Sequence, residues 1–166
     1  YFFLRSENLS RTAAVFGAVV GMNLSYITLW HWQLVITESL LFLPLILYLV
    51  NRYLQNKKII YLLWITLSLT FCLFGGHAQT LIYVYIIYWA FALFRRMPIK
   101  PLLITSLAPI ILGAVQLFPS LEAYLLSARE GAETKQLFAP FIFPWKNIVT
   151  MIAPDYFGHP STRNYT

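Results

Sequence analysis

The stretch "FGGHAQTL" (residues 74–81) decides how the chain folds. It lies inside an uncharged, largely apolar block from Ile59 to Phe94, which is 36 residues long. As one helix this block would be about 54 Å long, whereas the hydrocarbon core of a bilayer is about 30 Å thick. Glycine adopts positive φ angles without strain, so Gly75-Gly76 is the natural place for a turn. The block therefore predicts a transmembrane hairpin with residues 75–79 at its tip.

The composition of the whole chain favours the same class of protein. Of the 166 residues, 59% are hydrophobic and 11% are charged, and the mean hydropathy is +0.66. This is too little charge for the surface of a soluble domain. The sequence begins at Tyr1 rather than Met, and we expect it to be a fragment of a longer chain. The net charge of +6 comes from basic residues in separate short loops, which argues against nucleic-acid binding.

The rest of the chain divides into similar segments. From Thr12 to Val50 the chain is almost uninterrupted apolar sequence. Its break is Trp30-His31-Trp32-Gln33, and paired tryptophans favour membrane interfaces. Ser10 is expected to cap the first helix. We predict an all-α fold, a polytopic transmembrane helical bundle over residues 1–118. Its five expected spans are 12–30, 34–54, 59–75, 78–95 and 101–118.

The basic residues predict the orientation of these spans. Lys and Arg concentrate in the cytoplasmic loops of membrane proteins. The tips at 31–33 and 75–79 contain neither, and an even number of spans joins each basic cluster to the next. Both tips and residues 119–166 are therefore expected on the extracytoplasmic side. The cytoplasmic clusters are Arg5 and Arg11; Arg52, Lys57 and Lys58; and Arg95, Arg96 and Lys100.

Residues 119–166 differ from the spans in composition. A short helix is expected from Ser120 to Glu130, beginning after Pro119 and ending at Gly131. The sequence that follows is rich in proline and aromatic residues and too interrupted for another span. We predict an ordered extracytoplasmic loop with one short helical or re-entrant piece near 145–153.

Several short motifs together resemble one family of bacterial membrane proteins. In order along the chain they are Gly76-His77-Ala78-Gln79, Gln116-Leu117-Phe118-Pro119-Ser120-Leu121-Glu122, Ser127-Ala128-Arg129, Pro144-Trp145 and Asp155-Tyr156-Phe157-Gly158. Their order and spacing over residues 10–160 resemble the YfhO-like proteins, multi-span relatives of the GT-C glycosyltransferases. Members of that family often carry Gly-His-Pro-Gln, Gln-Leu-x-Pro-x-x-Glu, Ser-x-Arg and Pro-Asn-x-Phe-Gly. This chain has Ala78 where proline is usual and Asp155 where asparagine is common.

The resemblance implies sugar transfer at the outer face of the bacterial cytoplasmic membrane. The donor would be a polyprenyl-phosphate-linked sugar, and the acceptor an envelope glycan or a teichoic-acid-like polymer. GT-C enzymes typically take their catalytic acidic residue from the first extracytoplasmic loop. Before the second expected span the one acidic residue is Glu7, on the cytoplasmic side. We therefore expect the catalytic base to lie outside this fragment, and no catalytic residue is assigned.

Five polar residues are candidates for substrate contact: Glu38, His77, Gln79, Glu122 and Arg129. His77 and Gln79 offer the donors and acceptors that a phosphate or sugar requires, but they would equally satisfy backbone groups of a tight turn. Glu38 lies about one turn inside the outer end of its span, where a carboxylate is costly unless it is paired or faces an aqueous cavity. If the side chain of Glu38 instead extends to the membrane interface, its carboxylate is solvated there and would have no role in substrate contact.

The remaining candidates also have two interpretations. Arg129 would clamp a lipid phosphate with its planar guanidinium, or it would lie with Glu122 on an exposed surface helix. His31, His77 and Glu38 have suitable metal-ligand types but no diagnostic spacing. We predict no metal site in this fragment, and a divalent cation is a candidate cofactor of the complete enzyme.

A second class of function fits the same sequence. A non-catalytic transporter or lipid-handling protein would also carry intramembrane polar residues and broken helices. An acidic residue in an upstream outer loop would favour the glycosyltransferase, and inverted internal repeats would favour the transporter.

Overall fold

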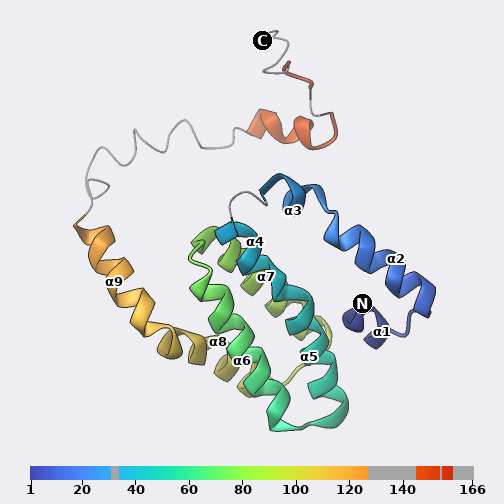
Figure 1. The fold of residues 1–166 in the computed structure, drawn as a ribbon, viewed down its shortest axis with the longest axis vertical. Helices are drawn as coiled ribbons and strands as arrows, with labels where there is room; N and C mark the ends of the chain where they lie inside the picture. Colours follow the sequence, from blue (N-terminus) through green and yellow to red (C-terminus); the bar gives the residue numbers. More distant parts are fainter. Residues whose placement is uncertain (31–33, 127–144, 154, 159–166) are drawn as a thin grey trace. The chain divides into compact units, whose positions relative to one another are not determined.

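The computed structural model describes residues 1–30, 34–126, 145–153 and 155–158 (Figure 1). These residues are helical or in turns and loops, and they include no β-strand, so the prediction of an all-α fold is confirmed for them. The chain divides into two compact units, Tyr1–Pro119 and Ser120–Thr166.

From α4 to α9 the helices follow one another with connections of one to four residues. Ser10 caps α2 as expected, because its side chain accepts a hydrogen bond from the backbone N–H of Ala13 at 3.2 Å. A short 3₁₀-helix falls where a helical piece was predicted near 145–153. The helices are α1 (Phe2–Ser6), α2 (Arg11–Met22), α3 (Ser25–Trp30), α4 (Leu34–Leu41), α5 (Leu43–Asn56), α6 (Ile59–Phe74), α7 (Ala78–Phe94), α8 (Ile99–Leu112), α9 (Ala114–Leu125) and η2 (Trp145–Met151).

The helix predicted over 12–30 is interrupted. It ends at Met22, and α3 begins only at Ser25. The side-chain amide of Asn23 donates to the carbonyl of Val19 at 2.8 Å. Asparagine can thus replace backbone hydrogen bonding with side-chain hydrogen bonding, which makes it a common residue at helix ends.

The region around Pro119 also differs from the prediction of a span over 101–118 followed by a helix that starts after the proline. Instead α8 ends at Leu112, and α9 runs through Pro119 to Leu125. A Cβ atom at Gly113 would lie 2.8 Å from Cδ2 of Leu73, so α6 approaches the chain there as closely as a glycine allows. Pro119 removes one backbone donor, and the helix continues past it.

The bundle of the first unit is built around α6. Helices α5 and α8 pack on α6, whereas α7 packs on α4 and α5. In Figure 1, α5 and α6 run side by side in opposite directions. The core contains the following buried apolar residues: Ile46, Leu49, Val50, Ile65, Leu69, Cys72, Val84, Tyr88, Ala92, Met97 and Leu102.

Polar side chains connect α7 to α8 inside this bundle. The hydroxyls of Tyr88 and Thr105 lie 2.5 Å apart, and the indole N–H of Trp89 donates to Ser106 Oγ at 3.0 Å. The hydroxyl of Tyr85 donates to the backbone carbonyl of Ser106 at 3.1 Å. The helices are therefore held together by hydrogen bonds as well as by apolar packing.

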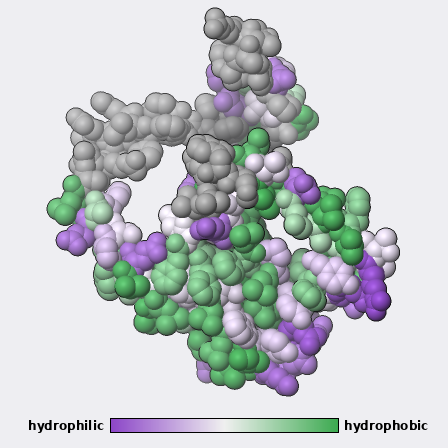
Figure 2. Space-filling view, viewed as in Figure 1, coloured by the Kyte–Doolittle hydropathy of each residue, from purple (hydrophilic) through white to green (hydrophobic). Residues whose placement is uncertain are grey.

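The outer surface of the bundle is apolar. Figure 2 shows hydrophobic side chains over most of the helical region and hydrophilic ones gathered at lower right, where α5 ends. The exposed apolar residues of α6, α7 and α8 include Ile59, Leu63, Trp64, Phe71, Ile82, Ile86, Leu93, Phe94, Ile104, Leu107 and Ile111. A monomeric soluble protein rarely exposes so large an apolar surface.

Helix length supports fewer complete spans than the sequence predicts. Phe42, between α4 and α5, has helical backbone angles, and within the described ranges the continuous stretch Ile36–Asn56 is the one long and apolar enough to cross a bilayer. Helices α8 and α9, which are bent by 66° relative to each other, would form a second membrane span if they are taken together as one broken span. At 1.5 Å per residue, the 16 residues of α6 and the 17 of α7 are about 24 and 26 Å long. The prediction of five complete spans is not confirmed.

A buried polar cluster closes one end of the bundle. The amide nitrogen of Asn51 donates to Ser6 Oγ at 2.9 Å and to the Glu7 carboxylate at 2.6 Å. The Asn51 carbonyl accepts from Nε of Arg95 at 3.1 Å, and the Arg95 guanidinium lies 3.5 Å from the same carboxylate. This cluster joins α1, α5 and the C-terminal end of α7.

We expect Asn51→Ala to destabilise the protein by about 2–3 kcal/mol, because it removes the hydrogen bonds of a buried amide to Ser6, Glu7 and Arg95 and leaves a small cavity. Asn51 is 1% exposed. The control is Asn56→Ala in the same helix, where the exposed amide bonds only to the carbonyl of Arg52. Thermal unfolding in detergent micelles should show a clear loss for Asn51→Ala and little change for Asn56→Ala. Equal unfolding temperatures would show that the cluster contributes nothing.

Candidate functional site

The turn predicted at Gly75-Gly76 is present and connects α6 to α7. Gly75 ends α6 with helical backbone angles, and Gly76 has a φ of +76°, which favours glycine. A Cβ atom at Gly75 would overlap Ser39 Oγ, and it would lie 3.2 Å from both the backbone nitrogen of Ser39 and the carbonyl of Cys72. Helix α4 is therefore pressed against the hairpin tip.

His77 caps the first turn of α7. Its Nδ1 accepts a hydrogen bond from the backbone N–H of Thr80 at 3.2 Å and lies 2.7 Å from the Thr80 hydroxyl. Because Nδ1 accepts from the backbone, the ring proton of a neutral imidazole must be on Nε2. His77 is partly exposed, so its Nε2–H is a donor available at the hairpin tip.

Two amide side chains belong to the hairpin tip or approach it. Gln79 is exposed, and its Nε2 donates to the Tyr83 hydroxyl at 2.6 Å. The Nε2 of Gln116 lies 3.6 Å from the point that a Cβ of Gly76 would occupy. The hairpin tip thus combines one ring N–H with amide groups from two separate parts of the chain, which suits oxygen-rich ligands.

Glu38 faces away from this tip. Ile36, Thr37 and Ser39 are buried, whereas Glu38 is exposed. The helix turns about 100° per residue, so Glu38 projects from the side of α4 opposite to Ile36. The hydroxyl of Ser39, not the carboxylate, meets the hairpin by donating to the carbonyl of Cys72 at 3.2 Å. The structure therefore does not bring Glu38 together with His77.

The other candidates lie in the second unit or outside the described residues. Glu122 is exposed on the part of α9 that belongs to the second unit. Arg129 and His31 lie outside the described residues. Among the residues that are described, no group of three His, Cys, Asp or Glu side chains could hold a metal ion.

Sequence reasoning missed four residues that shape the tip: Ser39, Thr80, Tyr83 and Gln116. Thr80 and Tyr83 had local signals, because they lie three residues after His77 and four after Gln79, the spacings of a cap and of a helical side-chain pair. Ser39 approaches the turn through tertiary packing, and its local sequence carries no signal for it. Gln116 begins one of the motifs of the family resemblance, but that motif does not predict that the residue lies beside the turn.

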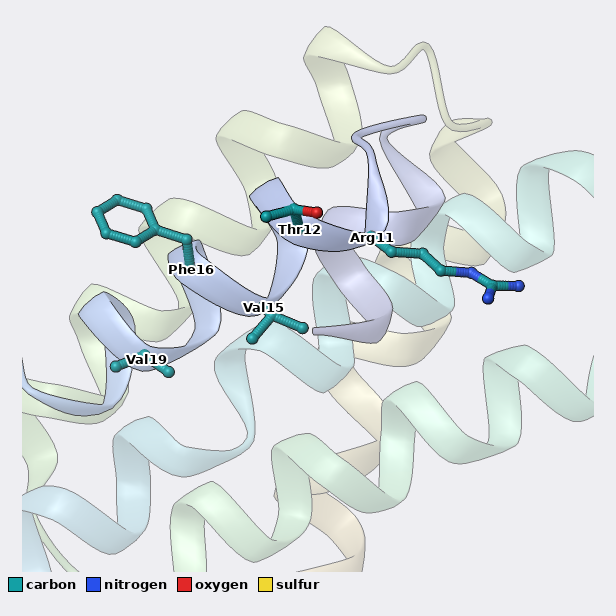
Figure 3. A pocket seen from close by; sticks show the side chains of 5 residues that line it. All are labelled: Arg11, Thr12, Val15, Phe16 and Val19. Carbon is teal, nitrogen blue, oxygen red and sulfur yellow. The ribbon is translucent and has the colours of Figure 1, made fainter.

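A separate hollow of about 530 Å³ lies on α2, and its lining includes none of the predicted site residues (Figure 3). Its lining comes from one face of that helix: Arg11, Thr12, Val15, Phe16 and Val19. In Figure 3, Phe16 and Arg11 extend toward opposite ends of the helix. Three of the five side chains are apolar, and no convergent polar groups surround the hollow, so the hairpin tip is the better candidate site.

Comparison with known proteins assigns neither a family nor a function to this chain. The chain matches no family model, no curated protein and no solved structure.

We expect Gly75→Ala to destabilise the protein by about 1–3 kcal/mol, because the added methyl group would be forced against α4. The control is Gly21→Ala in α2, where the new Cβ would have no neighbour within 4 Å. That change should be neutral or stabilising by about 0.5–1 kcal/mol. Thermal unfolding of the two variants should therefore shift in opposite directions. A Gly75 variant as stable as the wild type would show that α4 does not press on the tip.

Proposed function

We propose that the first unit is a multi-pass helical bundle of a bacterial cytoplasmic membrane, with the hairpin tip on the extracytoplasmic side. The apolar outer surface and the internal hydrogen bonds between α7 and α8 support a lipid environment. The end that contains Asn51 and Arg95 is also the end where Arg52 lies. This clustering supports the expected cytoplasmic orientation of the basic residues.

In its complete form, the protein would be a GT-C-type glycosyltransferase that uses a polyprenyl-phosphate-linked sugar. The observation that carries this proposal is the proximity of Gly76 and Gln116. Each belongs to one of the motifs whose order and spacing resemble YfhO-like proteins, and they are 40 residues apart in the sequence. Their meeting at one tip is expected if the motifs form one substrate-facing surface.

At such a surface His77 and Gln116 would bind and orient substrate. The Nε2–H of His77 and the amide N–H groups of Gln116 are donors, and phosphate and sugar oxygens accept hydrogen bonds. No carboxylate of the described hairpin lies beside these donors, so the acid–base step would depend on a residue from outside it. The tip therefore contributes substrate binding and positioning.

The alternative function, a transporter or lipid-handling protein, is favoured by one broken helix. α8 and α9 are bent by 66° at Gly113. Discontinuous helices commonly form binding sites in transporters. A glycosyltransferase and a transporter would be distinguished by the product that each forms. Purified complete protein in liposomes would form a new glycosidic bond in the first case, and would move lipid-linked sugar across the bilayer without such a bond in the second.

A substitution at His77 can separate capping from substrate binding. Asparagine is a good N-cap residue, so His77→Asn should keep α7 capped and leave protein abundance near normal. It removes the ring Nε2–H, and we expect sugar transfer by the complete protein to fall about 10- to 100-fold. The measurements are incorporation of labelled sugar into envelope acceptor and abundance by immunoblot.

His77→Ala is the matched control, because it removes both the cap and the donor and should lower abundance as well as transfer. Wild-type transfer by His77→Asn would show that His77 only caps the helix. Absence of glycosidic product in the wild-type protein would instead exclude the glycosyltransferase proposal itself.

A further inference from the structure

A second hollow, of about 320 Å³, lies between α1 and α5 at the end of the bundle opposite to the hairpin tip. Most of its wall is polar or charged. The lining residues are Phe2, Arg5, Ser6, Asn8, Tyr48, Arg52 and Gln55.

The hollow carries two positive charges without a negative one. Among the described residues, neither Arg5 nor Arg52 forms an ion pair. The nearest acidic residue in the sequence, Glu7, is held by Asn51 and Arg95 and is absent from the wall. An anion in the hollow would therefore meet two guanidinium groups whose charge is not compensated.

The Arg52 guanidinium is incompletely hydrogen-bonded. Its Nη1 donates to Gln55 Oε1 at 3.3 Å, whereas its Nε is buried without an acceptor. A buried N–H without a partner is uncommon in folded proteins. Arginine presents Nε and Nη together as a planar fork that matches two oxygens of a phosphate. A phosphate is thus a ligand chemistry that suits the guanidinium of Arg52.

Other parts of the wall suit the same ligand. Arg5 is fixed by a hydrogen bond from its Nη1 to the carbonyl of Leu9. Asn8 has a left-handed backbone, with φ of +63°, which returns the chain after α1 toward α2. On the apolar side, the rings of Phe2 and Tyr48 have centroids 6.2 Å apart. These rings offer contact to the carbon part of a phosphate ester.

We propose that the hollow lined by Arg5 and Arg52 binds a phosphate group. The phosphate of an anionic lipid headgroup and free inorganic phosphate share this chemistry. In the proposed orientation the hollow lies at the cytoplasmic face, where basic pockets between helices bind anionic headgroups. The proposal does not depend on sugar transfer at the opposite face.

The test measures binding to the purified full chain in neutral detergent by native mass spectrometry and titration. The probes are dihexanoyl phosphatidylglycerol, dihexanoylglycerol, which lacks the phosphate, and inorganic phosphate. The Arg5→Gln/Arg52→Gln variant removes both guanidinium groups. Its control, Lys58→Gln/Lys100→Gln, removes two exposed charges outside the hollow.

Phosphatidylglycerol should bind the wild type and the lysine control equally, and the arginine variant at least about tenfold more weakly. Competition by millimolar inorganic phosphate would identify free phosphate as a sufficient ligand, and its failure would identify the lipid ester. Equal weakening in both double variants, or equal binding of dihexanoylglycerol, would overturn the proposal.

A further variant guards against misfolding. Arg5→Lys/Arg52→Lys keeps both charges but loses the planar forks, so binding should weaken several-fold while the unfolding temperature stays near that of the wild type. Full affinity in this variant would contradict recognition by the guanidinium groups.

Discussion

The side-chain amide of Asn51 holds three separate segments of the chain at one end of the bundle. It contacts Ser6 and Glu7 from α1 and Arg95 from the end of α7, and it is itself part of α5. A buried amide must find partners for both its donor and its acceptor. Because these partners come from different segments, the C-terminal ends of α5 and α7 are held at the same end of the bundle. The turn at the beginning of α7 is then at the other end of the bundle.

The separation of the two ends gives the two proposed sites different chemistry. At one end, Arg5 and Arg52 surround a hollow with uncompensated positive charge. At the other, His77 and Gln116 present neutral donors at a glycine turn. Between them, the helices pair polar groups inward and expose apolar groups outward. Backbone and side-chain polar groups must be satisfied internally in lipid, and this arrangement does so.

The sequence predicts the local features of this structure better than the tertiary ones. Gly75-Gly76 and Ser10 were recognised because glycine and serine have specific backbone and capping roles. The break at Asn23 has a local signal, because Gly21, Asn23 and Ser25 are weak helix formers, but the apolar character that predicts the span continues across it. For Glu38, helical periodicity shows which residues share its face but not whether that face meets the bundle. The approach of Gln116 to Gly76 depends on how α6, α8 and α9 pack.

The most direct test of the account is the accessibility of single cysteines to a membrane-impermeant thiol reagent in intact cells. Native Cys72 is buried and should contribute little background. Gln79→Cys, at the hairpin tip, should be labelled from outside, whereas Lys58→Cys, at the basic end, should be labelled only after the membrane is opened. Both positions are exposed in the fold, so the difference would come from the membrane alone. Labelling of both from the same side would contradict the proposed membrane-spanning bundle.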